Sequence, residues 1–208
     1  MFFHIGKRGG HLSALHLHQK SSYFSRFDVS DFFGNVSKSK LVRALRRIGF
    51  SEARAFDFAT ESVVVNNGRK HLPFGFCQSP LLATLVLEKS LLGVKLKKAA
   101  ETMLVSVYMD DILISCDDAS LLEIVSEAVV VAAQESGFPL SPEKLSLVST
   151  STDIFNCHMV KDELSIQAER MQSFKAKYYA TSEFGKAAIE KYIAAVAPSE
   201  LARFQALL

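Results

Sequence analysis

Two adjacent carboxylates, Asp110 and Asp111, are the residues of this sequence best suited to chemistry. They lie between the apolar runs 103–107 and 112–115, which are typical of β-strands, so we expect them at the tip of a tight hairpin. Like charges this close repel each other unless a cation lies between them. The pair therefore indicates a site for a hard cation such as Mg²⁺, although Asp is also common in turns for backbone reasons alone.

A third carboxylate, Asp28, lies at the end of a predicted strand over residues 23–29, which is rich in aromatic and β-branched side chains. If this strand lies beside the hairpin, Asp28 completes a three-carboxylate site. Such a site holds two divalent ions that stabilise the attacking and leaving oxygens of a phosphoryl transfer. Asp31, three residues further on, fits a cap of the following turn instead.

The composition is that of an ordinary globular protein. The chain has 208 residues, 49 % of them hydrophobic and 22 % charged, which suits one domain with at most a small appendage. No apolar run reaches the roughly 18 residues that a membrane span requires. The start of the chain lacks the pattern of a secretory signal. Because the three cysteines are odd in number and scattered, we expect a reducing, cytoplasmic environment without disulfides or structural zinc.

The charge is distributed unevenly. The net charge is +2, but residues 1–70 hold 12 Lys and Arg against 5 Asp and Glu, whereas residues 71–208 hold 12 against 17. The basic first third suits contact with phosphates, and the acidic remainder suits metal ions. A solvated helix face explains one basic cluster equally well, namely Lys38, Lys40, Arg43, Arg46 and Arg47.

The order of predicted elements favours an α+β fold. We expect residues 1–22 to be irregular, and we expect an antiparallel sheet with helices packed on one face. The predicted helices run from the Ser37 cap to Gly49 and over residues 51–65, 81–97 (after a cap at Ser79-Pro80) and 120–136. The predicted strands cover residues 23–29, both arms of the hairpin, 145–149, 154–160 and 164–166, and the rest of the chain is helical in pattern.

Five segments in chain order resemble the motifs of the reverse transcriptase family. They are FDVSDFF at 27–33, LPFGFCQSPL at 72–81, YMDD at 108–111, GFPLSPEK at 137–144 and the strand–turn–strand at 155–166. The resemblance implies the palm of a right-hand polymerase over residues 23–166. Residues 1–22 would then be a remnant of truncated fingers, and residues 167–208 a short, helical, thumb-like segment.

The resemblance also implies the activity and its main residues. The chain would be an RNA-directed DNA polymerase that transfers deoxynucleotides to a 3′-OH. Asp28 and Asp110 would be the principal ligands of two Mg²⁺ ions, with Mn²⁺ as an alternative, and Asp111 would assist. Lys144 would orient the triphosphate or protonate the pyrophosphate leaving group, unless it is an ordinary exposed lysine.

Further positions would contact the substrates. Phe33 falls at the steric-gate position, where a bulky ring excludes a ribose 2′-OH, although a core aromatic is the alternative. Gly75 would let the backbone approach the nucleotide, because it lacks a Cβ. The remaining substrate-contacting residues implied by the resemblance are Phe74, Gln78, Ser79, Tyr108 and Met109.

Two departures from the family pattern leave alternatives open. Phe74 stands where many members have a Gln that contacts the nucleotide, which resembles abortive-infection and other defence-associated bacterial reverse transcriptases. Some of these are thought to use a protein primer, and Tyr178 or Tyr179 would suit that role unless they are packing residues.

The second departure is the short segment before the first motif. It offers only Lys7, Arg8, Lys20 and Arg26 to a triphosphate. The expected partners are an RNA template, a DNA primer and dNTPs, with a noncoding RNA or a second polymerase subunit supplying missing parts. The alternatives are a non-catalytic or partner-dependent palm subunit, and a fragment of a retron or group II intron reverse transcriptase.

Overall fold

The computed structural model describes residues 10–66 and 68–206, and Lys7 and Arg8 lie outside this range. The helices are α1 His11–His18, α2 Lys38–Arg47, α3 Glu52–Ser62, α4 Ser79–Glu88, α5 Leu91–Ala99, α6 Ala119–Glu135, η1 Pro142–Lys144, α7 Ala168–Ala180, α8 Glu183–Val196 and α9 Pro198–Gln205. The strands are β1 Tyr23–Asp28, β2 Val64–Asn66, β3 Arg69–His71, β4 Leu104–Tyr108, β5 Asp111–Cys116, β6 Ser146–Ser149, β7 Ser151–Ile154, β8 Cys157–Val160 and β9 Glu163–Ile166.

A four-stranded antiparallel sheet in the order β4-β5-β1-β6 forms the centre of the fold. The predicted hairpin joins β4 to β5, with Tyr108 paired to Asp111. Strand β1 lies beside β5, and its last residue, Asp28, is directly opposite Asp111. The predicted α+β architecture with an antiparallel sheet is confirmed.

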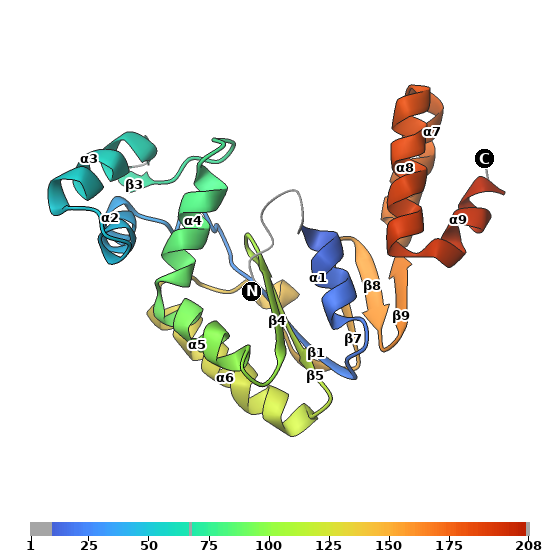
Figure 1. The fold of residues 1–208 in the computed structure, drawn as a ribbon, viewed down its shortest axis with the longest axis horizontal. Coiled ribbons are helices and arrows are strands. Elements are labelled where there is room, and N and C mark those ends of the chain that lie inside the picture. The colour runs from blue at the N-terminus through green and yellow to red at the C-terminus, as the bar shows by residue number, and fades with distance from the viewer. Residues whose placement is uncertain (1–9, 67, 207–208) are drawn as a thin grey trace.

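The two faces of this sheet pack against different layers. Because side chains alternate along a strand, Phe27 and Ile112 belong to the core beneath α5 and α6, whereas Phe24 and Leu113 belong to a second core on the opposite face. That second core includes residues of α1, of the three-stranded sheet β7-β8-β9 and of the C-terminal helices. Figure 1 shows α5 and α6 on one side of the central strands and α1 on the other.

Helix α1 contradicts the prediction that residues 1–22 are irregular. A buried polar contact accounts for part of its position. The fully buried ring of His18 lies 2.6 Å from Ser115 Oγ and 2.8 Å from Ser106 Oγ, on the central sheet. This polar contact between distant residues helps to stabilise the short helix, and a hydrophobic pattern in the sequence does not reveal it.

A lobe of α2, α3 and the β2–β3 hairpin lies to the left of the sheet in Figure 1. The prediction that the second helix of this lobe continues to residue 65 is wrong. It ends at Ser62, and Val64 and Val65 enter a strand that pairs with His71 and Lys70. Two β-branched residues and a glycine at φ 73°, Gly68, favour this hairpin over a further helical turn.

The single helix predicted over residues 81–97 is also wrong, because the chain bends between α4 and α5. Ser90 caps α5 by accepting a hydrogen bond from the N–H of Gly93 at 3.2 Å. A Cβ at Gly93 would lie 2.4 Å from the carbonyl oxygens of Leu87 and Glu88. The bend therefore requires glycine at this position.

Three helices, α7, α8 and α9, follow β9 and stand apart from the central sheet in Figure 1. Their presence matches the predicted helical end of the chain. The boundaries proposed for fingers, palm and thumb stay predictions. Among residues 10–66 and 68–206, no helix is long and apolar enough to cross a membrane.

Candidate active site

The central sheet brings the three predicted carboxylates to one end of β1 and β5. Asp28 pairs with Asp111 in the sheet register, and the N–H of Val29 donates to the carbonyl oxygen of Asp110 at 2.9 Å. Met109 has φ 56°, as a tight two-residue turn requires. The predicted hairpin thus places Asp110 and Asp111 beside the end of β1.

Asp110 and Asp111 lie in an environment that disfavours negative charge. Asp28 exposes only 7 % of its side chain. Burial raises the pKa of Asp110, and the charge of Asp28 adds to this effect. Burial also raises the pKa of Asp111, against the opposing effect of the Arg26 guanidinium. An added cation would stabilise the ionised forms of these groups.

Lys144 supplies one positive charge to the site. Its Nζ donates to Asp28 Oδ2 at 2.7 Å, and this hydrogen bond raises the pKa of Lys144. The loop that carries Lys144 is anchored to the same strand end, because the N–H of Ser141 donates to the carbonyl oxygen of Asp28 at 2.8 Å. Lys144 therefore lies in direct contact with one of the three carboxylates, and its predicted role toward the triphosphate stays a prediction.

Arg26 supplies a second positive charge, which the sequence analysis did not assign to the carboxylates. Its Nη2 lies 3.2 Å from Asp111 Oδ1, and its Nη1 donates to the carbonyl oxygen of Asp153 in β7. The guanidinium thus links the hairpin to the second sheet. The sequence did contain a signal for this contact. Arg26 precedes Asp28 by two residues, so the two side chains lie on the same face of the strand.

The donor set suits a divalent ion, although the carboxylates face basic side chains instead. In the described part of the chain, no group of three or more His, Cys, Asp or Glu is arranged to hold a metal ion. Asp28 and Asp111 contact Lys144 and Arg26. Carboxylate oxygens are nevertheless the ligands that Mg²⁺ and Mn²⁺ prefer, and burial raises the pKa of Asp110, so a bound cation would favour its ionised form. The metal assignment stays a prediction.

Phe33 and Phe74 form an aromatic pair near the end of the first motif. Their ring centroids are 6.0 Å apart in an edge-to-face arrangement, and Phe33 also packs on Phe32 at 5.5 Å. Phe33 is half-buried, whereas Phe74 is 88 % exposed. Phe74, which departs from the family pattern, therefore lies next to Phe33, the predicted steric gate, and adds an exposed aromatic ring beside it.

The other residues of the second motif lie around the start of α4. Gly75 has φ 87°, a conformation that glycine adopts without strain, and it is exposed. Gln78 occupies the N-cap position without a side-chain cap bond, so the prediction that Ser79 caps this helix is wrong. Ser79 is the first helical residue, and its buried hydroxyl has no hydrogen-bond partner among the described residues.

Tyr108 connects the hairpin to the second sheet. Its ring lies edge-to-face against Phe155 at 5.6 Å and against His11 at 6.1 Å. His11 also packs against Tyr192, and burial together with the charge of Arg170 lowers its pKa. The sequence analysis missed His11, because a histidine in a segment expected to be irregular carries no pattern.

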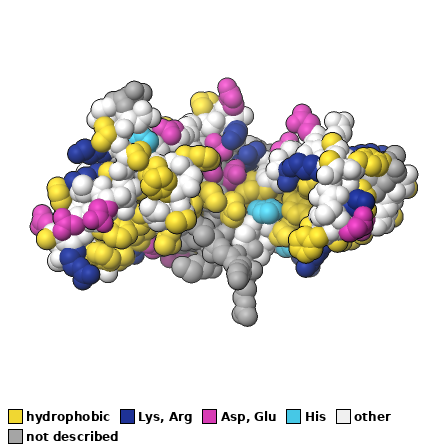
Figure 2. Space-filling view, turned by 90° about the horizontal axis from the view of Figure 1, so that it is seen from above, with side chains coloured by type: hydrophobic (Ala, Val, Ile, Leu, Met, Phe, Trp, Pro, Cys, Tyr) yellow, Lys and Arg dark blue, Asp and Glu magenta, His cyan; other side chains and the backbone are white. Residues whose placement is uncertain are grey.

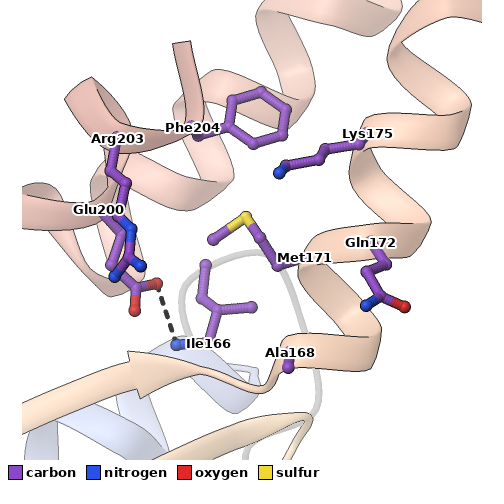
Figure 3. Close-up of a pocket in the computed structure, with 8 residues that line it drawn as sticks. All are labelled: Ile166, Ala168, Met171, Gln172, Lys175, Glu200, Arg203 and Phe204. Atoms are coloured by element: carbon purple, nitrogen blue, oxygen red, sulfur yellow. Dashed lines mark hydrogen bonds between the residues drawn. The ribbon is translucent and has the colours of Figure 1, made fainter. Parts of the chain in front are cut away.

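Tyr178 and Tyr179, the suggested protein primers, lie on α7. Tyr178 donates from its hydroxyl to Glu190 Oε1 at 2.7 Å and packs on Phe204 at 5.6 Å, whereas Tyr179 is 67 % exposed. A cavity of about 310 Å³ lies between β9, α7 and α9, lined by Met171, Lys175 and Arg203 among others (Figure 3). It shares no residue with the carboxylate site, and the priming role stays a prediction.

The sequence matches a known protein family. The sequence profile of the family "Reverse transcriptase (RNA-dependent DNA polymerase)" matches residues 3–179. Among curated proteins, the Gag-Pol polyproteins of avian leukosis virus subgroup A (isolate RSA) and Rous sarcoma virus subgroup B (strain Schmidt-Ruppin) are each 36 % identical over 76 residues. These matches cover 36 % of this chain and 5 % of each polyprotein.

Solved structures show the same fold. A foamy viral protease–reverse transcriptase in complex with double-stranded DNA superposes with a TM-score of 0.55 at 20 % identity, covering 90 % of this chain and 30 % of that protein. Telomerase from Candida albicans superposes with a TM-score of 0.54 at 11 % identity, covering 78 % of this chain and 35 % of the telomerase. The chain therefore spans about a third of the length of these structural relatives.

Proposed function

Because the chain belongs to the reverse transcriptase family, we propose that it is the palm of an RNA-directed DNA polymerase and extends a primer 3′-OH with deoxynucleotides. The observation that carries this proposal is the meeting of Asp28, Asp110 and Asp111 at one end of the central sheet. These three carboxylates would hold two Mg²⁺ or Mn²⁺ ions. Such ions supply charge neutralisation for the attacking and leaving oxygens.

Lys144 supports the departure of pyrophosphate. Its contact with Asp28 raises its pKa, so the ammonium stays protonated at neutral pH. Because about half of its side chain is exposed, it can reach a phosphate without leaving a buried position. The Lys144 ammonium therefore keeps its positive charge beside the carboxylates, where it would stabilise the negative charge of a leaving pyrophosphate.

Phe33 and Phe74 select the nucleotide. The Phe33 ring contacts Phe74 edge-to-face and also packs on Phe32, and these two contacts would limit its movement. A fixed ring excludes an additional 2′-hydroxyl more effectively than a mobile one, so deoxynucleotides are favoured. Phe74 replaces hydrogen bonding by apolar contact, since a phenyl ring has no donor or acceptor. The exposed Phe74 ring would pack against the sugar or base of the nucleotide.

Primer extension tests this function. The protein is incubated with Mg²⁺, dNTPs and a DNA primer annealed to an RNA template, and Asp110→Ala serves as the matched variant. We expect extension by the wild type alone, and extension with dNTPs rather than NTPs. Equal incorporation by both proteins would contradict the assigned site.

A partner-dependent palm is the second candidate. The specific observation in its favour is that Asp111 and Asp28 already form ion pairs with Arg26 and Lys144 within the chain. In this case a polymerase subunit or a noncoding RNA supplies the remaining contacts. Purification of the tagged chain from its host, followed by primer extension on the isolated chain and on the complex, distinguishes the two. Activity confined to the complex supports the second candidate.

The biological role is part of the same proposal. Phe74 supports a defence-associated bacterial reverse transcriptase, and a retron or group II intron enzyme is the alternative. Genes for a toxin or an effector beside this gene would support the first, and a retron RNA or an intron would support the second.

A further inference from the structure

Helices α5 and α6 lie side by side on the outer side of the central sheet and expose apolar side chains to solvent. Val94 of α5 is 56 % exposed, and Ile124 and Val131 of α6 are 65 % and 55 % exposed. Leu91 and Leu121, on the same two helices, are exposed as well. Single exposed apolar residues are normal on a protein surface, but a group of them on adjacent helices indicates a contact surface.

The exposed charges of the two helices have opposite signs. On α5, Lys95 and Lys98 are exposed, and the helix contains no acidic residue. On α6, Glu127 and Glu135 are exposed, and the helix contains no basic residue. No ion pair within residues 10–66 and 68–206 includes any of these four side chains. Each helix therefore presents charge of one sign to solvent, without an ion-pair partner in this part of the chain.

Helical spacing places these apolar and charged side chains on one surface. On α5, Val94 and Lys98 are four residues apart. On α6, Glu127, Val131 and Glu135 follow one another at the same interval. Residues four apart lie on the same face of a helix, and the other faces of α5 and α6 pack into the core between these helices and the sheet. We call the exposed surface the α5–α6 face, defined by Val94, Lys95, Lys98, Glu127, Val131 and Glu135.

The two helices run antiparallel, which brings their charges to similar levels (Figure 1). The N–H of Leu92 donates to Ser136 Oγ at 2.9 Å, so the start of α5 lies beside the end of α6. At about 1.5 Å per residue, Lys98 is about 9 Å along α5 from this contact. Glu127 is about 13 Å along α6 from the same contact, so the two charges differ in level by less than about one helical turn.

A second copy of the chain fits the α5–α6 face because the face is complementary to itself. A twofold axis that runs between and along the two helices places α5 of one copy opposite α6 of the other, at the same level. The lysines of each α5 then face the glutamates of the opposite α6, and the exposed valines cover one another. Opposite charges arranged in this way fix the register of a contact and disfavour other partners.

We propose that the α5–α6 face joins two copies of this chain into a homodimer. Helix α6 is about 25 Å long and packed helices lie about 10 Å apart, so the face offers about 500 Å² per copy. A stable complex buries roughly 800 Å² per partner, so this dimer is weak and its population depends on concentration. The contact requires no catalysis and stands whether or not the chain polymerises DNA.

The proposed dimer leaves the opposite side of the molecule open. Figure 2 looks onto the side away from α5 and α6, where acidic and basic side chains lie together near the centre. Because the twofold contact involves only the two helices on the far side of this view, each copy keeps that charged side accessible.

Analytical ultracentrifugation of the wild-type protein, over about a hundredfold range of concentration, tests for the dimer. We expect the mass to rise from that of one chain toward that of two. Lys95→Glu/Lys98→Glu opposes like charges at both contacts, so we expect this variant to stay a monomer. The matched control is Lys177→Glu/Lys191→Glu, which changes the same charge on exposed lysines of α7 and α8. A wild type that is monomeric throughout, or equal association of the two variants, would overturn the proposal.

A charge exchange separates a contact between copies from a change in folding. Glu127→Lys/Glu135→Lys reverses the acidic side of the face, and we expect this variant to be monomeric as well. When it is mixed with Lys95→Glu/Lys98→Glu, every contact again joins opposite charges. We expect a mixed dimer whose dissociation constant is within about tenfold of the wild-type value. Two variants that keep the wild-type circular dichroism but do not associate when mixed would contradict the proposed contact.

Cross-linking of the wild-type protein gives a measurement that does not depend on variants. Equal amounts of unlabelled and isotopically heavy protein are mixed and treated with a carbodiimide, which joins a lysine amine to a carboxylate in direct contact. We expect links between Lys98 and Glu127 that contain one light and one heavy peptide, because such links can form only between copies. Mixed links confined to other segments, or links between α5 and α6 of one isotope only, would overturn the proposal.

Discussion

Replacement of Arg26 by methionine tests the link between the carboxylate hairpin and the second sheet. Methionine keeps an apolar side chain of similar reach but removes the guanidinium. Two contacts are lost, the ion pair with Asp111 at 3.2 Å and the hydrogen bond to the carbonyl oxygen of Asp153. The side chains of Arg26 and Asp111 are 19 % and 20 % exposed, so solvent replaces these contacts poorly.

The expected loss follows from these contacts. A hydrogen bond contributes about 1 kcal/mol net, and more when a charged group takes part. The Asp111 carboxylate also stays largely buried after its cationic partner is removed, and this unpaired charge adds to the loss of stability. We expect Arg26→Met to lower the free energy of unfolding by about 2–3 kcal/mol. For a chain of this size, that lowers Tm by about 4–12 °C.

Urea unfolding followed by circular dichroism, at several pH values, measures this loss. Arg26 favours the ionised form of Asp111, whose pKa burial raises. The part of the stabilisation that comes from the ion pair with Asp111 is therefore present above the pKa of Asp111 and is lost as the pH falls through it. The difference between wild type and variant should shrink in acid.

Arg46→Met is the matched control. Arg46 pairs with Glu52 at 3.7 Å, but the two side chains are 54 % and 78 % exposed, so we expect a change of at most about 0.5 kcal/mol. If Arg26→Met and Arg46→Met have equal effects at neutral pH, Arg26 does not link the two sheets.

Four further predictions concern single residues. Asp110→Asn should raise the free energy of unfolding at pH 7 without metal, because the raised pKa of Asp110 means that its ionisation destabilises the fold. In urea unfolding, this gain should vanish below the pKa of the carboxyl group in the unfolded chain. A gain of the same size in acid would contradict the prediction. Phe33→Ala should reduce the preference for dNTPs over NTPs by about tenfold or more, measured by single-nucleotide incorporation; an unchanged ratio would identify Phe33 as a core residue only. Ser90→Ala should lower the free energy of unfolding by about 1 kcal/mol through loss of the α5 cap, and unaltered urea unfolding would refute the cap. Gly75→Ala should cost about 1–2 kcal/mol because φ is 87° and no neighbour lies within 4 Å to compensate; stabilisation in the same assay would exclude that backbone strain.

The sequence was sufficient to predict the carboxylate end of the sheet, because two local rules agreed there. Apolar runs on both sides of Asp110 and Asp111 require a hairpin, and the alternation of β1 orients Asp28. The same alternation places Arg26 beside Asp28, so this residue was accessible to sequence reasoning. Its second partner, the carbonyl oxygen of Asp153, was not, since a contact across 127 positions depends on the packing of the two sheets.

The missed elements have physical explanations of the same kind. The three-residue strands β2 and β3 are too short for a periodic pattern, and only the turn at Gly68 separates them. The bend at Ser90 interrupts a run whose hydrophobic pattern suits a continuous helix, and the close approach at Gly93 becomes apparent only in three dimensions. Helix α1 is held by Leu15 in the second core and by the buried contact of His18 with two serines of the sheet.

The central claim is that Asp28, Asp110 and Asp111 form a cation site, and a Mn²⁺ titration followed by electron paramagnetic resonance tests it most directly. The account predicts that the wild type depletes the signal of free Mn²⁺ and that Asp28→Asn and Asp110→Asn do so much less. As a control, Asp57→Asn, on α3 outside the site, should bind like the wild type. Equal Mn²⁺ binding by the wild type and by all three variants would contradict the account.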